Sequence, residues 1–400
     1  MTASPGGAHT LIVDNPFTGE PACEVPLADA RAASAVLDRA REAARAWRTS
    51  ALADRIALCE RAVAALEKNA ETIASDITRM MGKPLVQARG EVTGTATRAR
   101  AMIGLAQAAL ADVVPAPLDG FERRIVREPL GVVLDLPAWN YPMLTAVNCV
   151  VPAVLAGNAV VVKHSPRSPL CGRHFAKAFA EAGAPPNLVQ SIDCDHTQSE
   201  HMVADERVDH VVFTGSVFGG HRMVDAAVKR FLHPTLELGG NDPAYVAPDC
   251  DLAKAAENVV DGAIYNAGQS CCAVERVYVH EAVYGKFLEA VAPLVKAYVM
   301  GDPNSPTTTL GPVAQPHHVA ELEAFVSDAT SRGGRVIAGG KAASVDGRGR
   351  FFQATLVADC DQAMELFNRE SFGPIVPVLK VASDEEALAK MNDSRLGLTA

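Results

Sequence analysis

The stretch GVVLDLPAWNYPMLTAVNCVVPAVLAGNAVVVK, residues 131–163, carries the pattern that decides the fold. It opens with the apolar run Val132–Leu136, turns through residues 137–142, continues as a helical run from Met143, and closes with the apolar run Ala159–Lys163. Short apolar runs on either side of a helical pattern are typical of buried parallel strands joined by a crossover helix. The stretch therefore predicts a strand, a helix and a second strand of one parallel sheet.

The same alternation continues on the C-terminal side. Further short apolar runs and helical patterns follow one another; the strands are expected at 188–192 and 210–214, and the helices at 170–182 and 219–230. A second alternation of strands and helices runs from Ala244 to the end of the chain. Because 400 residues exceed what a single core usually holds, we expect an α/β protein of two or more domains.

On the N-terminal side, residues 30–110 are rich in Ala, Leu, Glu, Arg and Lys with apolar positions at helical spacing, which predicts several long helices. After Pro115 and Pro117, apolar residues alternate with charges, which predicts an exposed hairpin. The segment Ala342–Arg350, with glycines among charged residues, is expected to be a mobile surface loop.

Composition and charge exclude several classes of protein. The chain is 48% hydrophobic and 21% charged, which is ordinary for a globular protein, and its formal net charge of −10 includes no basic run that would bind nucleic acid or a membrane surface. The N-terminus has no positive segment followed by an apolar run, and apolar stretches such as Cys149–Gly157 are too short to span a bilayer. We therefore expect a cytoplasmic protein without nucleic-acid or membrane partners.

The nine cysteines show no paired C-x-x-C spacing, so the sequence suggests no metal site. Most are expected to be small buried apolar residues. Cys271 and Cys272, which are adjacent, are the exception because of their context.

Four short motifs attract functional interpretations. Asn140 lies in the turn Pro137–Pro142 between a strand and a helix, where it could present its amide to a ligand, although a turn-forming asparagine is the commoner explanation. Glu237 ends the apolar segment Thr235–Leu238 and precedes a glycine pair, and a charge in such a segment is costly unless it is paired or used.

The third motif is Gly268–Ala273, in which Cys271 follows a turn of small residues after a helical stretch. At a helix start this thiol would gain thiolate character from the helix dipole, while the structural alternative is a buried cysteine. The fourth motif is Glu370–Pro374, which could also be a plain surface turn.

Together and in this order, Asn140, Glu237, Cys271 and Glu370 resemble the aldehyde dehydrogenase superfamily over nearly the whole chain. The resemblance extends to three further segments: Asn15-Pro16 with Gly19, Gly157–Lys163, and Phe213–Ser216. Four independent motifs in one order reduce the structural alternatives for each of them.

The resemblance implies an enzyme that oxidises an aldehyde to a carboxylate with NAD(P). Cys271 would attack the aldehyde, and the thioester formed after oxidation would be hydrolysed. The Asn140 amide and the Cys271 N–H would stabilise the oxyanion, each donor contributing about 3 to 4 kcal/mol. Glu237 would activate the hydrolytic water.

The resemblance also implies a Rossmann-like cofactor domain without the G-x-G-x-x-G fingerprint, which this chain lacks. Ser216, after Gly215, would hold the pyrophosphate at a helix N-terminus, and Lys163 would bind the adenosine ribose. The remaining cofactor contacts are assigned to the nicotinamide ribose (Glu370), to the nicotinamide (Phe372) and to the neighbouring walls (Trp139, Pro166 and Gly239).

One departure from the family pattern concerns the choice of cofactor. NAD-preferring members commonly carry a glutamate three residues after the lysine, and here that position is Pro166, followed by Arg167 and Ser168. Without that carboxylate, NADP should be tolerated, and NAD is only slightly favoured.

The implied organisation is a cofactor domain (1–118 and 139–237), an oligomerisation hairpin (119–138) and a catalytic α/β domain (238–400), with a homodimer or homotetramer as the assembly. Family members continue beyond the position of Ala400, so the C-terminus is expected to be truncated.

Two alternatives remain at this stage. A CoA-acylating aldehyde dehydrogenase would cleave the thioester with CoA, but such members generally lack a base at the position of Glu237. A catalytically silent structural or interaction protein is the other alternative. The sequence does not select the aldehyde, because the residues near Tyr141, Thr145 and Cys272 that would line its path suit aliphatic or aromatic aldehydes as well as acidic semialdehydes.

Overall fold

The computed structural model describes residues 10–400, which fold into two compact units. Unit 1 comprises Met1–Val13, Cys23–Asp76 and Arg89–Glu237, and unit 2 comprises Asp14–Ala22, Ile77–Ala88 and Leu238–Ala400. The N-terminal nine residues, for which the sequence suggests no signal segment, lie outside the described part. Each unit has its own five-stranded sheet.

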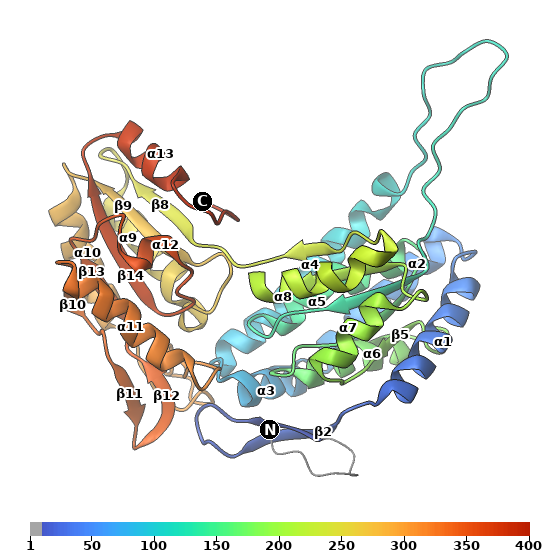
Figure 1. Ribbon diagram of the computed structural model, residues 1–400, viewed down its shortest axis with the longest axis horizontal. Helices are drawn as coiled ribbons and strands as arrows, with labels where there is room; N and C mark the ends of the chain where they lie inside the picture. The colour runs from blue at the N-terminus through green and yellow to red at the C-terminus, as the bar shows by residue number, and fades with distance from the viewer. Residues whose placement is uncertain (1–9) are drawn as a thin grey trace. The chain divides into compact units, whose positions relative to one another are not determined.

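Unit 1 holds most of the N-terminal half of the chain (Figure 1). Its elements, four of which (β1, β2, α3 and α4) have part of their residues in unit 2, are β1 (Thr10–Asp14), β2 (Pro21–Pro26), α1 (Ala30–Trp47), α2 (Leu52–Lys68), α3 (Ala70–Met81), α4 (Leu85–Ala109), β3 (Val132–Leu136), α5 (Pro142–Leu155), β4 (Ala159–Val162), α6 (Pro169–Glu181), β5 (Val189–Ser191), α7 (His196–Ala204), β6 (His210–Thr214), α8 (Val217–Ala227), η1 (Val228–Arg230) and β7 (Thr235–Glu237). The long helices expected over 30–110 are present as α1 to α4.

The sheet of unit 1 has the strand order β5-β4-β3-β6-β7, and every pair in it is parallel. The chain leaves the central strand β3 toward β4 and β5, and returns to its other side with β6 and β7. This reversal is the switch point of a Rossmann-type sheet, beside which ligands bind at the carboxyl ends of the strands. β3 and β4 are entirely buried, as their mainly apolar sequences predict, and the burial in β3 includes its one charged residue, Asp135.

An arm formed by residues 111–130 projects from unit 1 (Figure 1). Only isolated bridges join its two sides, with Val113 and Ile125 exchanging backbone hydrogen bonds of 3.0 and 2.8 Å. The hairpin was predicted at residues 119–138. It does not extend that far, because Val132–Leu136 forms β3 of the buried sheet. Apolar character on both faces, rather than alternation with charges, separates that strand from the arm.

Unit 2 holds the second sheet. Its elements are β8 (Asp242–Val246), α9 (Leu252–Ile264), η2 (Tyr265–Gly268), β9 (Val274–His280), α10 (Tyr284–Lys296), α11 (His318–Ser331), β10 (Arg335–Ala338), β11 (Ala342–Val345), β12 (Arg348–Phe352), β13 (Thr355–Ala358), α12 (Glu365–Asn368), β14 (Ile375–Val381) and α13 (Asp384–Asn392). The strand order is β10-β13-β14-β9-β8, and only the edge pair β10 and β13 is antiparallel.

The loop expected at Ala342–Arg350 is instead the hairpin of β11 and β12. Asp346 (φ 52°) and Gly347 (φ 73°) both occupy the left-handed region at its tip. An Asp-Gly pair supports such a two-residue turn, and this signal was missed because the flanking strands are short and half exposed.

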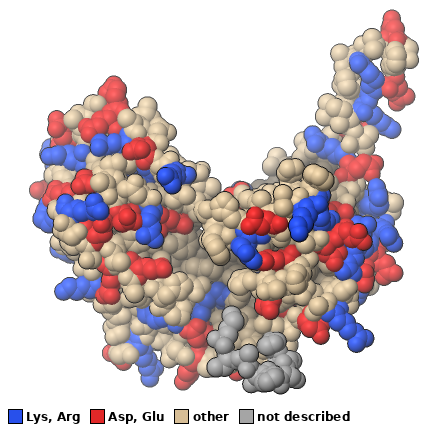
Figure 2. All heavy atoms as spheres, in the orientation of Figure 1, with Lys and Arg blue, Asp and Glu red and all other residues tan. Residues whose placement is uncertain are grey.

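Lys, Arg, Asp and Glu side chains are interspersed on the face of the molecule drawn in Figure 2. None of the helices in the described part of the chain has both the length and the hydropathy needed to cross a bilayer.

Candidate active site

In unit 1, four of the predicted site residues lie at the carboxyl edge of the sheet. Asn140 follows β3, Lys163 follows β4, Ser216 follows β6, and Glu237 is the last residue of β7. The pairing of Thr214 with Glu237 brings the ends of β6 and β7 side by side. The parallel topology therefore gathers residues that are up to about a hundred positions apart in the chain.

Asn140 is buried in the loop before α5, and Trp139 beside it is half buried. Pro142 begins α5 at the first helical turn, where a proline fits because its missing N–H would have no helical partner. The backbone N–H groups of Met143 and Leu144 instead reach the buried carboxylate of Glu91, at 2.8 and 3.4 Å. A helix start anchored in this way holds the Asn140 loop in place.

Lys163 is buried directly after β4, and its backbone N–H donates to Asp135 O at 2.9 Å. Burial lowers the pKa of its ammonium group, and the charges of Cys194, Asp193 and Asp195 oppose that change. The Lys163 head group therefore lies among groups of the β5–α7 loop.

Pro166 is half buried in the turn before α6, whereas Arg167 is buried, with 8% of its surface exposed. Arg167, the cation that follows Pro166, is therefore largely withdrawn from the surface. His164, in the same turn, is fully buried; its Nε2 lies 2.9 Å from Pro142 O and its Nδ1 lies 3.1 Å from Ser168 Oγ. Burial lowers the pKa of His164 to about 4.

The segment Gly215-Ser216 fits a dinucleotide pyrophosphate. Gly215 donates its N–H to Glu237 O at 3.0 Å, and a Cβ at position 215 would come within 2.7 Å of the Phe213 ring. Ser216 is exposed and caps α8 by accepting the N–H of Gly219 at 3.1 Å. An exposed helix N-terminus next to a glycine offers backbone donors to a phosphate.

Glu237 is exposed at the end of β7. The expectation that this carboxylate is buried in an apolar segment was wrong, because β7 is a three-residue edge strand with Thr235 also exposed. The cost of burying a charge therefore gives no argument for a function of Glu237. An exposed carboxylate has the access to water that a residue activating a water molecule needs.

In unit 2 the motifs lie at the edge of the sheet where the strands begin. Gly239 and Gly240 precede β8, Cys271 precedes β9, and Glu370 precedes β14, and these three strands are neighbours in the order β14-β9-β8. The amino ends of parallel strands meet at one edge. The structure therefore brings the glycine pair, the thiol and the carboxylate together.

Cys271 lies in a turn between η2 and β9, so the expectation that it stands at a helix start was wrong. The preceding turn is formed by three successive left-handed residues, Asn266, Ala267 and Gly268. A Cβ on Gly268 would lie 2.0 Å from Gly373 O, so only glycine permits this approach to the Glu370 motif. Gln269 holds the turn by accepting the N–H of Ala314 at 2.8 Å.

The Cys271 and Cys272 thiols share a hydrogen bond. That bond lowers the pKa of Cys272 to about 6 and raises the pKa of Cys271 well above its ordinary value. The two thiols therefore titrate as a pair, and the thiolate forms on Cys272 before it forms on Cys271.

Glu370 is half buried and lies against the glycine pair. Its Oε1 accepts the N–H of Gly240 at 3.1 Å, and a Cβ on Gly239 would lie 2.3 Å from Oε2. Burial, followed by the charge of Glu275, raises the pKa of Glu370 to about 7. A Cβ on Gly240 would also meet the Cys271 carbonyl at 2.2 Å, so close packing against the backbone requires a glycine at position 240.

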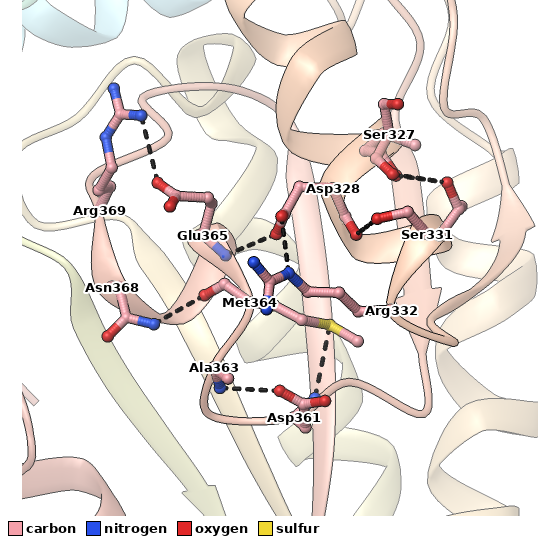
Figure 3. A network of polar contacts seen from close by, with 12 residues as sticks. Ser327, Asp328, Ser331, Arg332, Asp361, Ala363, Met364, Glu365, Asn368 and Arg369 are labelled. Atoms are coloured by element: carbon pink, nitrogen blue, oxygen red, sulfur yellow. Dashed lines mark hydrogen bonds and ion pairs between the residues drawn. The ribbon is translucent and has the colours of Figure 1, made fainter.

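The segment before Glu370 is fixed by a polar network between α11 and α12 (Figure 3). Asp328 Oδ2 accepts the N–H of Glu365 at 2.8 Å, and its Oδ1 accepts from Arg332 Nε at 2.7 Å. The Glu365 hydrogen bond, together with Arg332, lowers the pKa of Asp328. The Glu365 carboxylate also pairs with Arg369 at 3.2 Å, which leads the chain into Glu370.

Two residues of this region were not assigned a role from the sequence: Asn241 and Glu275, both buried. Glu275 stands beside the charged Arg276 in the strand VERVYVH, so the sequence carries no local signal that this carboxylate is buried. Among residues 10–400 no group of three or more His, Cys, Asp or Glu side chains is arranged to hold a metal ion.

The sequence model of the aldehyde dehydrogenase family matches residues 3–400. The chain is 31% identical over 402 aligned positions to the NADP(+) succinate-semialdehyde dehydrogenase of Deinococcus radiodurans, covering all of this chain and 84% of that enzyme. It is 34% identical to a betaine aldehyde dehydrogenase of Cereibacter sphaeroides, covering 96% of this chain and 79% of that one. A solved succinate-semialdehyde dehydrogenase from Burkholderia pseudomallei superposes with a TM-score of 0.93 at 30% identity, covering 97% of this chain and 80% of that structure.

The chain combines a parallel-sheet unit of Rossmann type with a second α/β unit, in which a thiol and a carboxylate lie at one edge of the sheet. This combination defines a class of dinucleotide-dependent oxidoreductases. The chain belongs to the aldehyde dehydrogenase family. The predicted fold class, the enzyme class and the choice of NAD or NADP as cofactor are confirmed by this membership and by the named relatives.

Proposed function

We propose that the protein oxidises an aldehyde to its carboxylate, with Cys271 as the nucleophile. The observation that carries this proposal is the position of the Cys271 turn, which packs closely against Gly240 and, through Gly268, against the Glu370 motif. The thiolate sulfur attacks the carbonyl carbon and forms a thiohemiacetal. The Asn140 amide and the Cys271 N–H stabilise the oxyanion, which neutral donors do without protonating it.

Glu237 acts on the second half of the reaction. Its exposed carboxylate takes a proton from the water that attacks the thioester carbonyl, and the Cys271 thiolate leaves as the carboxylate product forms. This role requires access to water, which fits an exposed side chain at the end of a strand. A CoA-acylating enzyme would need no such base.

The residues that we assign to NAD(P) are those at the carboxyl edge of the unit 1 sheet, together with the Glu370 motif. When bound, the nicotinamide accepts the hydride of the oxidation step. Ser216 and Gly215 hold the pyrophosphate at the start of α8, and Lys163 binds the adenosine ribose. Glu370 binds the nicotinamide ribose, and Gly239, Trp139 and Phe372 line the site.

NAD is slightly favoured over NADP in this proposal. Lys163 lies near Asp193 and Asp195, whose negative charges disfavour a 2′-phosphate. Pro166, where NAD-preferring members carry a glutamate, adds no further repulsion, so NADP is also used.

We further propose that the enzyme is a homodimer or homotetramer assembled through the arm 111–130, whose exposed apolar side chains include Phe121 and Ile125. The domain roles follow the family: unit 1 binds the cofactor and unit 2 carries the nucleophile. All nine cysteines are free, which fits the reducing cytoplasm.

The Cys271→Ser variant tests the proposed activity. NADH and NADPH formation is followed with a panel of aliphatic, aromatic and acidic semialdehydes for the wild-type chain, Cys271→Ser, and a matched control, Cys250→Ser. We expect the control to retain turnover and Cys271→Ser to lose at least about a thousandfold, because a hydroxyl is a far weaker nucleophile than a thiolate.

The same assay separates the alternatives. Turnover that appears only when CoA is added would identify an acylating enzyme. Equal activity in Cys271→Ser and the wild type would contradict the mechanism, and inactivity of both with every aldehyde would favour a silent protein.

A further inference from the structure

Glu275 is a buried carboxylate with four hydrogen-bond donors around it, and none of the proposed catalytic steps uses it. It is the second residue of β9, four positions after Cys271, and 3% of its surface is exposed. Its Oε1 accepts from Phe372 N at 2.7 Å and Ser371 Oγ at 3.1 Å. Its Oε2 accepts from Ser371 N at 2.9 Å and Asn241 Nδ2 at 3.0 Å.

Three of these four donors belong to the residues directly after Glu370. The Asn241 amide that reaches Glu275 also donates to Arg369 O at 3.0 Å, so the backbone is held on both sides of Glu370. Because charged acceptors make strong hydrogen bonds in buried surroundings, this cluster fixes the path of the chain through position 370.

Phe372 adopts a backbone conformation that is unfavourable for its residue type, so contacts with other residues must hold it. Its φ of 53° lies in the left-handed region, which is unfavourable for an aromatic residue. The hydrogen bond from its N–H to Glu275 and the contact of His318 Nε2 with its carbonyl, at 3.0 Å, keep this conformation. Release of either anchor favours relaxation of residues 370–372.

The same carboxylate joins three segments of unit 2. Asn241 follows the glycine pair that contacts Glu370 and Cys271, and Glu275 itself stands on the strand that follows the Cys271 turn. A single buried group therefore couples the positions of the glycine pair, the nucleophile strand and the Glu370 motif.

We propose that Glu275 is a positioning residue that sets Glu370 and Phe372 in the geometry in which they hold the nicotinamide ribose and the ring beside it, through its four hydrogen bonds to Asn241, Ser371 and Phe372. This inference rests on the proposed cofactor role of Glu370. Glu275 itself does not touch the cofactor.

The Glu275→Gln variant is the sharpest test. It preserves size and removes acceptor capacity together with the negative charge that raises the pKa of Glu370, and whichever oxygen the amide nitrogen replaces, a backbone N–H of Ser371 or Phe372 loses its acceptor. Glu281→Gln, an exposed glutamate directly after the other end of the same strand, is the matched control. Ser371→Ala removes one of the four donors and leaves both backbone bonds in place.

Three quantities are measured on each full-length variant: amide hydrogen exchange of residues 369–373 without cofactor, the Kd of NAD⁺ by calorimetry, and the KM values of NAD⁺ and aldehyde. For Glu275→Gln we expect exchange and the NAD⁺ Kd and KM to rise about tenfold, because a buried N–H without an acceptor costs on the order of one power of ten in an equilibrium constant. The aldehyde KM should stay within about twofold. Ser371→Ala should give a smaller change in the same direction, and Glu281→Gln none.

The inference is overturned if Glu370→Gln weakens NAD⁺ binding while both Glu275→Gln and Ser371→Ala leave one of two quantities unchanged. These quantities are the exchange rate at 369–373 and the Kd of NAD⁺. If Glu370→Gln itself leaves NAD⁺ binding and KM unaltered, the proposed role of Glu370 fails instead. The exchange data, which need no cofactor, then still report whether Glu275 holds the segment.

Discussion

At the residue scale, the two adjacent thiols titrate together rather than separately. Their interaction lowers the pKa of Cys272 to about 6 and raises the pKa of Cys271 above its ordinary value. Ser270 Oγ lies 3.4 Å from the Cys272 sulfur and adds a second polar contact. The reactivity of Cys271 is therefore a property of the pair.

This argument predicts the behaviour of Cys272→Ala. Without its partner thiol, Cys271 loses the interaction that raises its pKa, so its alkylation by iodoacetamide at pH 7 should become about tenfold faster and its pH midpoint should move downward. Rates are measured by mass spectrometry of the Cys271 peptide between pH 5 and 10, with Cys250→Ala as control. An identical pH profile in Cys272→Ala and the wild type would rule out coupling between the thiols.

Sequence motifs identified Asn140, Glu237, Cys271 and Glu370 as candidates, because the residue types required by thioester chemistry stand in recognisable local contexts. Glu275 was not recognised, because its meaning depends on donors that come from Asn241 and from the Glu370 motif, far away in the chain. No local pattern contains that information.

At the scale of elements, the turn between β4 and α6 combines a proposed cofactor ligand with a buried neutral imidazole. The pKa of His164 is lowered from 6.5 to about 4 because burial disfavours the cation. The unfolded chain binds a proton below pH 6.5 and the folded chain does not until about pH 4. This group therefore contributes stability that is present above pH 6.5 and is lost as the pH falls toward 4, a difference of about 3 kcal/mol.

The prediction is that His164→Gln reduces this part of the pH dependence. The difference in unfolding free energy between wild type and variant, from urea titrations at pH 7 and pH 4.5, should shrink by about 2 to 3 kcal/mol on acidification. Gln keeps a donor for Pro142 O but does not titrate. The cause assigned here would be wrong if that difference were the same at both pH values.

The helices, strands and turns also show where hydrophobic periodicity failed to predict the structure. Strands β3 to β6 of unit 1 could be predicted within one or two residues because buried parallel strands are mainly apolar, whereas β1 and β2 were not predicted. The turn at Cys271 was mistaken for a helix start, because a string of small residues does not reveal the left-handed conformations of Asn266 and Ala267. The hairpin of β11 and β12 was mistaken for a loop for a related reason, since short half-exposed strands carry a weak signal.

At the scale of the whole molecule, the arm 111–130 is the clearest unsatisfied surface. Val114, Phe121 and Ile125 expose 75%, 68% and 61% of their surfaces. Burial of such a side chain contributes about 1.5 to 3 kcal/mol, so a few of them at an interface can hold subunits together. The proposed oligomer should therefore depend on the arm.

The double variant Phe121→Asp, Ile125→Asp should shift the protein toward monomers in light scattering coupled to size-exclusion chromatography, because it places two charges in an apolar contact. Leu388→Asp, at an exposed position of α13, is the control and should leave the mass unchanged. A wild-type protein that is already monomeric at micromolar concentration, or a double variant of unchanged mass, would contradict the proposed role of the arm.

The sequence by itself determined the class of fold, the approximate strands and helices, and the types of residue that the chemistry needs, because these depend on local hydrophobic periodicity and on short motifs. Only the tertiary structure decided that unit 1 presents its residues at the carboxyl ends of its strands while unit 2 presents Cys271 and Glu370 at the amino ends of β9 and β14. It also decided that Glu237 is exposed and that Glu275 is buried among four donors. Burial and hydrogen bonding arise from contacts between distant segments, so they appear only once the parallel strands have been ordered in space.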